Sequence, residues 1–374
     1  MHRSVIVVCL MLYVCIVRSQ TLLSNTTICD SCTNELRIDF EATAFLKNNE
    51  YFKEFVDGFT GIGAFIKPTI SYQFNNKTKA KIGIFMKSYF GTNEVNDIIP
   101  IFRIQHQITD DLQVVFGDLF GTLNHNLEEP LFRFDRYYEN PIESGLQFLY
   151  NSERFTSDLW VNWEKFIING DPDQEEFTIG STSLIKLFRI KSIEINVPIQ
   201  LLMNHFGGQI DASSNRKTTD LNGVNGLQIA YNLKENHQLL FEPLMLWYQN
   251  WEYRDNGNPQ NLRSGMAAYI KGSYSSPRWY AMIGYWNARN FVAPKGEFLF
   301  HSISETNPDF VERNRELITS KITYRRTVGR QVRLEAGFFS YYDTMINHFD
   351  YSFMFFIVLD DSFFLTKTKR KAKD

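Results

Sequence analysis

The sequence lacks any apolar run long enough to cross a membrane as a helix. Its longest uncharged apolar run, residues 5–17, has 13 residues, whereas a spanning helix needs ~20. It also lacks any stretch with a convincing 3.6-residue hydrophobic period, which an α/β enzyme would show several times. If the mature chain spans a membrane, it must do so as a closed β-barrel, whose strands satisfy one another's backbone hydrogen bonds.

Excess charge and nucleotide- or metal-binding motifs are lacking as well. The formal net charge is only −3 over 374 residues, which does not indicate a nucleic-acid partner. The sequence contains no P-loop, no dinucleotide fingerprint and no HExxH motif. We therefore expect no cofactor, no metal ion and no nucleic acid to bind.

Cysteine is scarce, with four residues, and two of them lie in the short apolar run. That run follows Arg3 and ends near Val17 and Ser19, which predicts a secretory signal over residues 1–19, with a helical anchor as the alternative. Cys29 and Cys32 would remain after export. In an exported protein such a pair favours a small local disulfide, and a redox motif is the alternative.

What the sequence does contain is a persistent alternation of apolar and polar residues. The stretch ISYQFNNKTKAKIGIFM places Ile70, Tyr72 and Phe74 on one face and resumes the same pattern after a tight turn. The alternation recurs early in LRIDFEATAFL and late in QVRLEAGFF. A period of two residues, with charges on one face only, predicts β-strands.

The predicted strands are joined by connections that alternate between short and long. Seven short turns separate eight hairpins, so we expect about sixteen strands, most of 9–13 residues. A tilted strand needs ~9–11 residues to cross a bilayer. Short turns at one end and long loops at the other are typical of an outer-membrane barrel. The predicted fold class is therefore all-β, a transmembrane antiparallel up-and-down β-barrel of about 16 strands.

Aromatic residues indicate which way the apolar faces point. Trp and Tyr cluster at strand ends, as at Tyr89, Trp247, Trp279 and Tyr341, and such amphipathic rings favour a membrane interface. We therefore expect the apolar faces to contact lipid and the polar faces to line a wet lumen. A secreted sandwich or solenoid is the alternative.

The expected organisation has four parts. Residues 1–19 form the signal, residues 20–35 a periplasmic segment with Cys29 and Cys32, residues 36–366 the barrel, and residues 367–374 a basic periplasmic tail. Removal of Arg3 and Arg18 with the signal changes the net charge to −5, and the tail carries +4, so the body carries −9. The last strand pattern, YSFMFFIVL, is apolar on both faces, which is compatible with packing against an inserted loop.

The chain resembles a known family at the level of pattern. The end of the signal before Gln20, the NNKT and NSERF turns, the stretch NWEKFIINGDPDQEEFT and the aromatic last strand are similar to Bacteroidota-type outer-membrane porin-like β-barrel proteins. The resemblance implies integral insertion into a bacterial outer membrane by the barrel-insertion machinery. It also implies that the lipid bilayer and small polar solutes are the partners, and it leaves a homo-oligomer open.

In porins of this strand number, the third outer loop folds into the lumen and narrows it. Here that loop is GTLNHNLEEPLFRFDRYYENP, residues 121–141, and its charges would set ion preference if they face one another across a constriction. A solvated loop with locally paired charges is the alternative. The candidates are Glu128, Glu129, Arg133, Asp135 and Arg136.

Charged residues on the predicted lumen face form a second candidate set. They would either guide a polar solute or pair across strands and stiffen the wall. The members are Arg37, Asp39, Glu41, Lys81, Arg103, Asp158, Glu164, Glu242, Arg333 and Glu335.

The sequence thus predicts a porin-like channel for passive diffusion of small hydrophilic solutes, weakly cation-preferring and not an enzyme. The first alternative is a non-conducting barrel for surface interaction or envelope assembly. The second is an outer-membrane hydrolase, which would need a histidine near a hydroxyl and a carboxylate. Its candidates are His205 with Asp211, and His301 with Ser302 and Glu305.

Overall fold

The computed structural model describes residues 22, 24, 26–52, 55–213, 216–254, 258, 260–307 and 309–368. The predicted signal, residues 1–19, and most of the predicted basic tail lie outside the described residues. Among the helices of the described residues, none is both long and apolar enough to cross a membrane.

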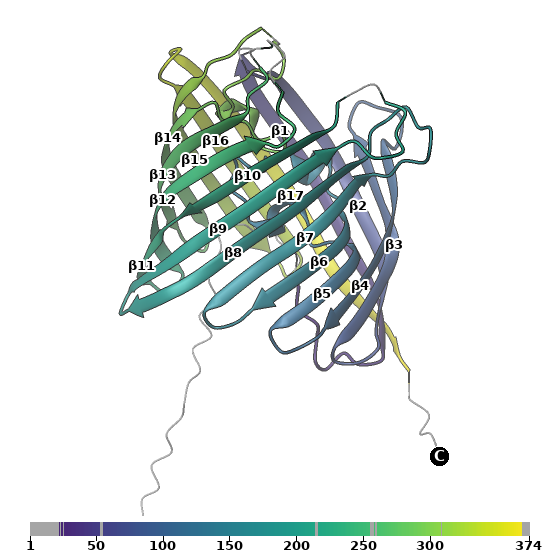
Figure 1. Cartoon of the computed structure of the whole chain (residues 1–374). Coiled ribbons are helices and arrows are strands. Elements are labelled where there is room, and N and C mark those ends of the chain that lie inside the picture. Colours follow the sequence, from purple (N-terminus) through teal and green to yellow (C-terminus); the bar gives the residue numbers. More distant parts are fainter. Residues whose placement is uncertain are drawn as a thin grey trace, which may run out of the picture.

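The described chain is almost entirely β-strand, as the alternation predicts (Figure 1). The strands are β1 Glu35–Phe52, β2 Asp57–Gln73, β3 Thr78–Tyr89, β4 Asp97–Gln107, β5 Leu112–Asp118, β6 Ser144–Asn151, β7 Phe155–Lys165, β8 Glu176–Ile190, β9 Ile193–Phe206, β10 Thr218–Gly226, β11 Gln228–Lys234, β12 His237–Asn250, β13 Ser264–Ser275, β14 Trp279–Arg289, β15 Asn314–Val328, β16 Val332–Asp343 and β17 His348–Lys367. Three short helices lie in the links: η1 Thr122–His125, α1 Arg136–Glu139 and η2 Phe298–Phe300.

The strands close into a single antiparallel barrel. β1 pairs with β2 on one edge and with β17 on the other, so the sheet has no open end. β10 and β11 both lie between β9 and β12 and are separated only by Leu227, so together they occupy one position in the wall. The barrel therefore has sixteen strand positions, and the predicted fold class is confirmed.

The two ends of the barrel differ, as the alternating connections predict. Short turns gather at the lower rim in Figure 1, where β17 also ends, and the long links gather at the upper rim. In outer-membrane barrels the short turns are periplasmic and the long loops extracellular. We call the upper rim the outer rim on this basis.

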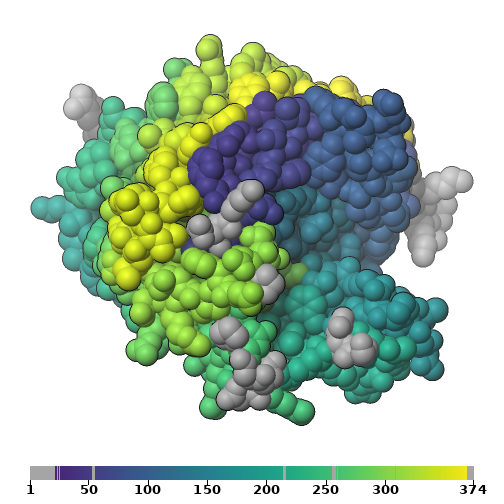
Figure 2. Space-filling view, turned by 90° about the horizontal axis from the view of Figure 1, so that it is seen from above, coloured from purple at the N-terminus to yellow at the C-terminus, as the bar shows by residue number. Residues whose placement is uncertain are grey.

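The hydrophobic core lies inside the barrel rather than between sheets. It is built from two long links, residues 119–143 between β5 and β6 and residues 290–313 between β14 and β15, which fold inward and pack against the wall. Figure 2 looks onto the outer rim, where yellow-green residues near 300 lie across the mouth beside the purple first strands. Leu131, Tyr138 and Phe300 from the links are buried together with wall residues such as Phe356.

This arrangement explains why the last strand is apolar on both faces. Phe356 points inward and contacts the rings of Phe134 and Tyr137 at 5.8 and 5.7 Å. Its neighbours Phe355 and Ile357 point outward and are 43% and 40% exposed, as residues facing lipid would be.

The segment before β1 also contacts the interior. Cys29 and Cys32 are joined by a disulfide with a Cα–Cα distance of 5.4 Å. Upstream of it, the backbone N–H of Ser24 donates to Asn124 Oδ1 at 2.8 Å, and Leu22 belongs to the buried core. The described part of this segment therefore reaches into the lumen.

Candidate active site at the outer rim

The charges of the inserted link 119–143 meet opposite charges on the wall. Glu128 lies 2.6 Å from Lys271 and Glu129 lies 2.8 Å from Lys321, and Asp135 lies 3.4 Å from Lys47. The remaining two loop candidates are also paired, Arg133 with Glu139 at 2.5 Å and Arg136 with Glu164 at 3.2 Å. The link is thus fastened inside the barrel by complementary charges.

The predicted lumen-wall charges mostly pair with neighbouring side chains. Asp39 and Glu41 contact Lys79, Lys67 and Lys81 within 3.8 Å, and Arg103 contacts Asp118 at 2.6 Å. The other recorded pairs are Arg37 with Glu35, Glu164 with Lys295, Glu242 with Lys271, and Arg333 with Asp360. Glu335 is buried. These contacts give the wall a cross-strand ladder of ion pairs.

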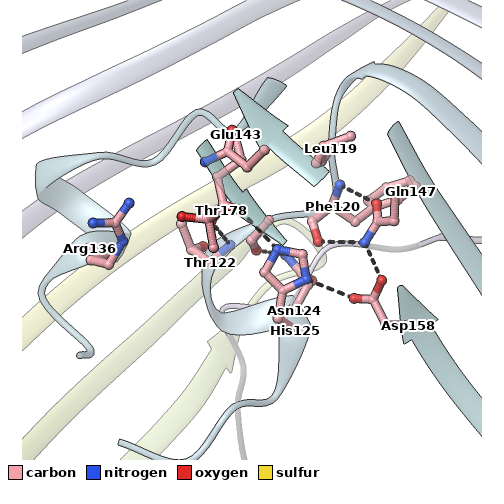
Figure 3. Close-up of polar contacts among 12 residues, drawn as sticks. Leu119, Phe120, Thr122, Asn124, His125, Arg136, Glu143, Gln147, Asp158 and Thr178 are labelled. Carbon is pink, nitrogen blue, oxygen red and sulfur yellow. Dashed lines mark hydrogen bonds and ion pairs between the residues drawn. The ribbon is translucent and has the colours of Figure 1, made fainter. Parts of the chain in front are cut away.

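Inside the barrel, the one histidine of the inserted link, His125, is fully buried and contacts polar side chains of the wall and the link (Figure 3). Its Nδ1 donates to Asp158 Oδ2 at 2.8 Å and its Nε2 donates to Glu143 Oε2 at 3.0 Å. The ring stacks on Trp160 with centroids 3.5 Å apart, and Trp160 in turn lies over Gly180, where a Cβ would approach the indole to 2.1 Å. Asp158 was predicted from sequence as a wall charge, but His125 was not singled out.

The protonation of His125 follows from its two partners. Ionised carboxylates only accept hydrogen bonds, so both ring nitrogens carry protons and the ring is an imidazolium. Burial by itself would lower its pKa, but the carboxylates of Glu143 and Asp158 outweigh burial and raise it to about 9. A fully buried ring with both nitrogens engaged cannot accept a proton from a substrate. His125 therefore fastens the link rather than serving as a base.

The second predicted hydrolase set does not assemble. His301 Nε2 accepts the backbone N–H of Ala293 at 3.3 Å, and burial lowers the pKa of the ring to about 3. Ser302 Oγ accepts the Phe291 N–H at 3.0 Å and donates to the Arg313 carbonyl at 3.3 Å. None of these contacts joins His301 to Ser302 or Glu305, so these residues hold the link 290–313 in shape.

The first predicted histidine, His205 at the end of β9, does lie beside a hydroxyl and a carboxylate. Its Nδ1 is 2.8 Å from Thr219 Oγ1, and its Nε2 is 2.6 Å from the carbonyl oxygen of Gly207. The same Thr219 hydroxyl lies 2.8 Å from Glu252 Oε1. Asp211, the expected partner of His205, instead accepts the backbone N–H of Gly208 at 2.8 Å.

The donors and acceptors of this cluster determine a path for one proton. The Gly207 carbonyl only accepts, so Nε2 of His205 carries a proton and orients the ring. The Thr219 hydroxyl donates its one proton to Glu252 Oε1, and its oxygen faces His205 Nδ1. When the Glu252 side chain moves aside, the hydroxyl can turn its proton toward Nδ1, and His205 is then placed to act as a base toward that hydroxyl. A base held by a third group beside a hydroxyl is the arrangement that activates nucleophiles.

The cluster faces outward, toward the membrane, at the outer rim. His205 lies on the same face of β9 as Ile199 and Leu201, which are 37% and 43% exposed. Thr219 is directly opposite His205 in the β9–β10 pairing, and residues opposite one another share a face. The neighbouring Phe177 ring lies 4.9 Å from His205.

Aromatic side chains surround the cluster at this level. Trp163 stacks on Phe177 at 5.3 Å, Trp247 lies over Gly223, and Trp251 is 60% exposed. Aromatic girdles of this kind mark the boundary between hydrocarbon and head groups. The cluster thus lies where the apolar part of the wall ends.

Thr219 and Glu252 were not predicted from sequence. The Thr219 pairing depends on the register of β9 against β10. This register follows the eleven-residue link of residues 207–217, whose path the sequence pattern does not fix. Glu252 lies beyond β12, so only the three-dimensional fold brings it to Thr219. Among the described residues, no group of three or more His, Cys, Asp or Glu side chains is arranged to hold a metal ion.

Comparisons with solved structures show the fold. The loop L8 deletion mutant of OmpT, an outer membrane protein of Vibrio cholerae, has 11% identity and a TM-score of 0.52, and the match covers 87% of this chain and 100% of that one. The outer membrane protein OprD of Pseudomonas aeruginosa has 7% identity and a TM-score of 0.50, and the match covers 91% of this chain and 97% of that one. At such identities the likeness concerns the barrel alone.

Comparisons of sequence concern the family. No curated protein matches the chain. The family model described as lipid A 3'-O-deacylase-type matches residues 25–368. This description names an enzyme, so the predicted porin function and the prediction that the chain is not an enzyme are wrong, and the hydrolase alternative fits better. Because the match covers far more than half of the chain, the chain belongs to the lipid A 3'-O-deacylase-type family.

Proposed function

We propose that this protein is an outer-membrane esterase that removes an ester-linked acyl chain from lipid A, with His205, Thr219 and Glu252 as its reaction centre. The observation that carries the proposal is the 2.8 Å contact between His205 Nδ1 and the Thr219 hydroxyl on the outward face of the wall. The family supplies the substrate class, and the cluster supplies a base and a nucleophile within hydrogen-bond reach.

The position of the cluster suits a substrate that stays in the membrane. Lipid A has a phosphorylated sugar head group at the surface and acyl chains in the hydrocarbon, so its ester bonds lie at the boundary between the two. His205 lies at that boundary, above Leu201 and beside Phe177 and Trp163. A lipid can therefore approach from the side without leaving the outer leaflet or entering the lumen.

The reaction would proceed by transfer of the acyl group to Thr219. His205 Nδ1 takes the hydroxyl proton as Thr219 Oγ1 bonds to the ester carbonyl carbon, and the bond from that carbon to the sugar oxygen breaks. His205 returns the proton to the sugar oxygen. In the second step a water oxygen bonds to the acyl carbon as His205 Nδ1 takes the water proton, and the bond from that carbon to Thr219 Oγ1 breaks. His205 returns the proton to Oγ1, and the fatty acid leaves. Before the first step, Glu252 has to release the Thr219 hydroxyl that it accepts in this structure.

Thr219 is only 5% exposed, covered by its contacts with His205 and Glu252. An ester carbonyl can reach Oγ1 only if the Glu252 side chain moves aside. We therefore expect the Glu252 side chain to change position when lipid binds.

The test is a deacylation assay on lipid A in mixed micelles, with the full chain refolded and the products weighed by mass spectrometry. His205→Gln and Thr219→Val should each lower the rate by about 100-fold or more, because each removes one partner of the proton transfer. Thr219→Ser should retain activity, because the hydroxyl remains. With Thr219→Ser, an acyl ester on the peptide containing residue 219 should be trapped at short reaction times.

The barrel offers a matched control pair at the opposite rim. His106 Nδ1 lies 2.9 Å from Thr78 Oγ1, with the two residues again directly opposite in adjacent strands. His106→Gln and Thr78→Val should leave deacylation unchanged. Full activity in both His205→Gln and Thr219→Val would place the reaction centre elsewhere, and no deacylation by the unmodified protein would overturn the proposed activity itself.

A further inference from the structure

The outward wall contains a second feature, far from His205, that the proposed reaction does not use. A depression of about 600 Å³ crosses strands β11 to β15 on the lipid-facing side. This volume lies within the ~300–1,000 Å³ typical of small-molecule sites. Its lining is almost wholly apolar and includes Ile229, Phe241, Gly272, Ala281, Ile283 and Ile322.

The depression exists because Gly272 has no side chain in a row of residues whose side chains are large. In the strand pairings Gly272 lies between Phe241 of β12 and Ile283 of β14, which are 47% and 62% exposed. A Cβ built on Gly272 would meet no atom within 4 Å. Glycine is therefore not required here by close backbone packing, and its effect is to leave a groove between two apolar walls.

The groove lies in the half of the barrel nearest the short turns. Two of its lining residues, Leu239 and Tyr274, lie next to the turns that join β11 to β12 and β13 to β14. With the short turns on the periplasmic side, this half contacts the inner leaflet. The lipids available to the groove are then phospholipids rather than lipid A.

Cations lie at the rim below the groove. Lys234, Arg278 and Arg326 are exposed, and within the described part of the chain none of the three side chains has a hydrogen-bond or ion-pair partner. Arg326 follows the lining residue Ile322 by four residues, or ~13 Å along the strand. Glu235, on the turn after Lys234, is the one acidic residue of the two turns nearest the groove.

Between the groove and the cations lies an interfacial aromatic pair. Trp279 and Tyr324 are opposite one another in β14 and β15, and their rings are 4.8 Å apart. Aromatic residues at this position mark the level of the head groups. The order along the wall is therefore apolar groove, aromatic pair and cations, which matches acyl chain, ester region and phosphate.

We propose that this groove holds one phospholipid with an anionic head group from the inner leaflet. An acyl chain would fill the space over Gly272, and the phosphate would contact Lys234, Arg278 and Arg326. Since lipid tails are as apolar as the wall, the gain comes from filling a void and from charge, not from removal of apolar surface from water.

The test is native mass spectrometry of the full chain in mild detergent, titrated with phosphatidylglycerol or with phosphatidylcholine of the same acyl chains. One phosphatidylglycerol should be retained in preference to phosphatidylcholine. Gly272→Leu should abolish this retention, because the new side chain enters open space and fills the groove. Arg278→Gln and Arg326→Gln should each weaken phosphatidylglycerol binding by about fivefold and leave phosphatidylcholine binding unchanged.

Ala80→Leu on β3 is the matched control, since Ala80 also lies opposite an outward residue, Ile104, but away from the groove. It should retain the lipid, and Ala281→Leu, a second groove-filling change, should lose it. Equal binding by Gly272→Leu and the unmodified protein would overturn the proposal. The proposal would also be overturned if Gly272→Leu abolished dimer formation rather than lipid retention, because a second copy of the chain would then occupy the groove. Deacylation should be unaffected by all of these variants, so the two proposals fail separately.

Discussion

At the scale of single residues, the histidines of this barrel differ by what their ring nitrogens contact. His125 gives both protons to carboxylates inside the lumen, whereas His205 gives one to a carbonyl and shares the other nitrogen with a hydroxyl. The first arrangement fixes a charge, and the second leaves a nitrogen that can gain and lose a proton. Residue type alone does not separate these roles.

The His125 contacts predict a pH-dependent contribution to stability. The folded-state pKa is raised from 6.5 to about 9, so the folded protein holds this proton more tightly than the unfolded chain. The contribution is fully present below pH 6.5 and is lost as the pH rises through about 9. At 1.36 kcal/mol per pKa unit, it is on the order of 3 kcal/mol.

Urea unfolding in lipid vesicles, followed by tryptophan fluorescence, measures this contribution. The free energy of unfolding should fall between pH 6 and pH 10 in the unmodified protein, and the fall should be smaller by about 3 kcal/mol in His125→Gln. The Glu143 carboxyl, whose pKa His125 lowers against the effect of burial, should lose its contribution only at acidic pH. An identical pH dependence in His125→Gln and the unmodified protein would contradict the imidazolium assignment.

At the scale of elements, the link 119–143 is held by buried ion pairs with the strands around it. Lys271 of β13 contacts Glu128 of the link at 2.6 Å and Glu242 of β12 at 3.2 Å, and all three side chains are 16% exposed or less. Removing a buried cation leaves carboxylates without compensation, which costs ~3–5 kcal/mol. Lys271→Met should therefore destabilise the barrel by about this amount.

Two comparisons test that prediction by the same unfolding measurement. Adding Glu128→Gln and Glu242→Gln to Lys271→Met should restore much of the stability, because no uncompensated charge then remains. Lys165→Met, which breaks an exposed pair with Asp173 at 2.8 Å, should cost less than ~1 kcal/mol. Equal losses for the buried and the exposed pair would show that the ion pairs do not fasten the link.

At the scale of the whole molecule, the barrel is a wall around a packed interior. Links 119–143 and 290–313 bring Leu131, Tyr138 and Phe300 into contact with the inner wall, and their charges pair with it. A lipid in the membrane can then reach the outward surface and the rims of the barrel, but not its interior. The proposed reaction centre and the proposed phospholipid groove both lie on that surface.

The packed interior predicts the absence of steady ion conduction. In planar bilayers, the refolded protein should show no stable single-channel steps. A variant in which residues 122–142 are replaced by a short Gly-Ser linker should show them, because the Glu128, Glu129 and Asp135 contacts with the wall are removed. Stable steps from the unmodified protein would contradict the filled lumen.

Sequence reasoning predicted the strands well, and it named one residue of the proposed site. The barrel class follows from alternation, because a half-buried strand has one apolar face whatever the partner strand is. His205 was singled out as a hydrolase candidate, but with Asp211 as its partner. Thr219 and Glu252 could not be found, because their proximity depends on strand register and on a link whose path no local pattern specifies.

The porin prediction failed for a related reason. The charges of the third link and of the wall were predicted to lie on the inner side, but one sequence does not show whether opposite charges face each other across water or are in contact. Glu128 and Lys271 are 143 residues apart in the chain and 2.6 Å apart in the fold. Charges in direct contact fill the lumen between them, whereas the same charges held apart would line a water-filled path.

By itself the sequence determined the strands, their number, the alternation of short and long connections, and which faces are apolar, since these depend on interactions over a few residues. Only the tertiary structure decided that two links fill the lumen, that His205 meets Thr219 and Glu252, and that Gly272 leaves a groove. These features arise from contacts between strands far apart in the chain, and closure of the barrel fixes the register that creates them.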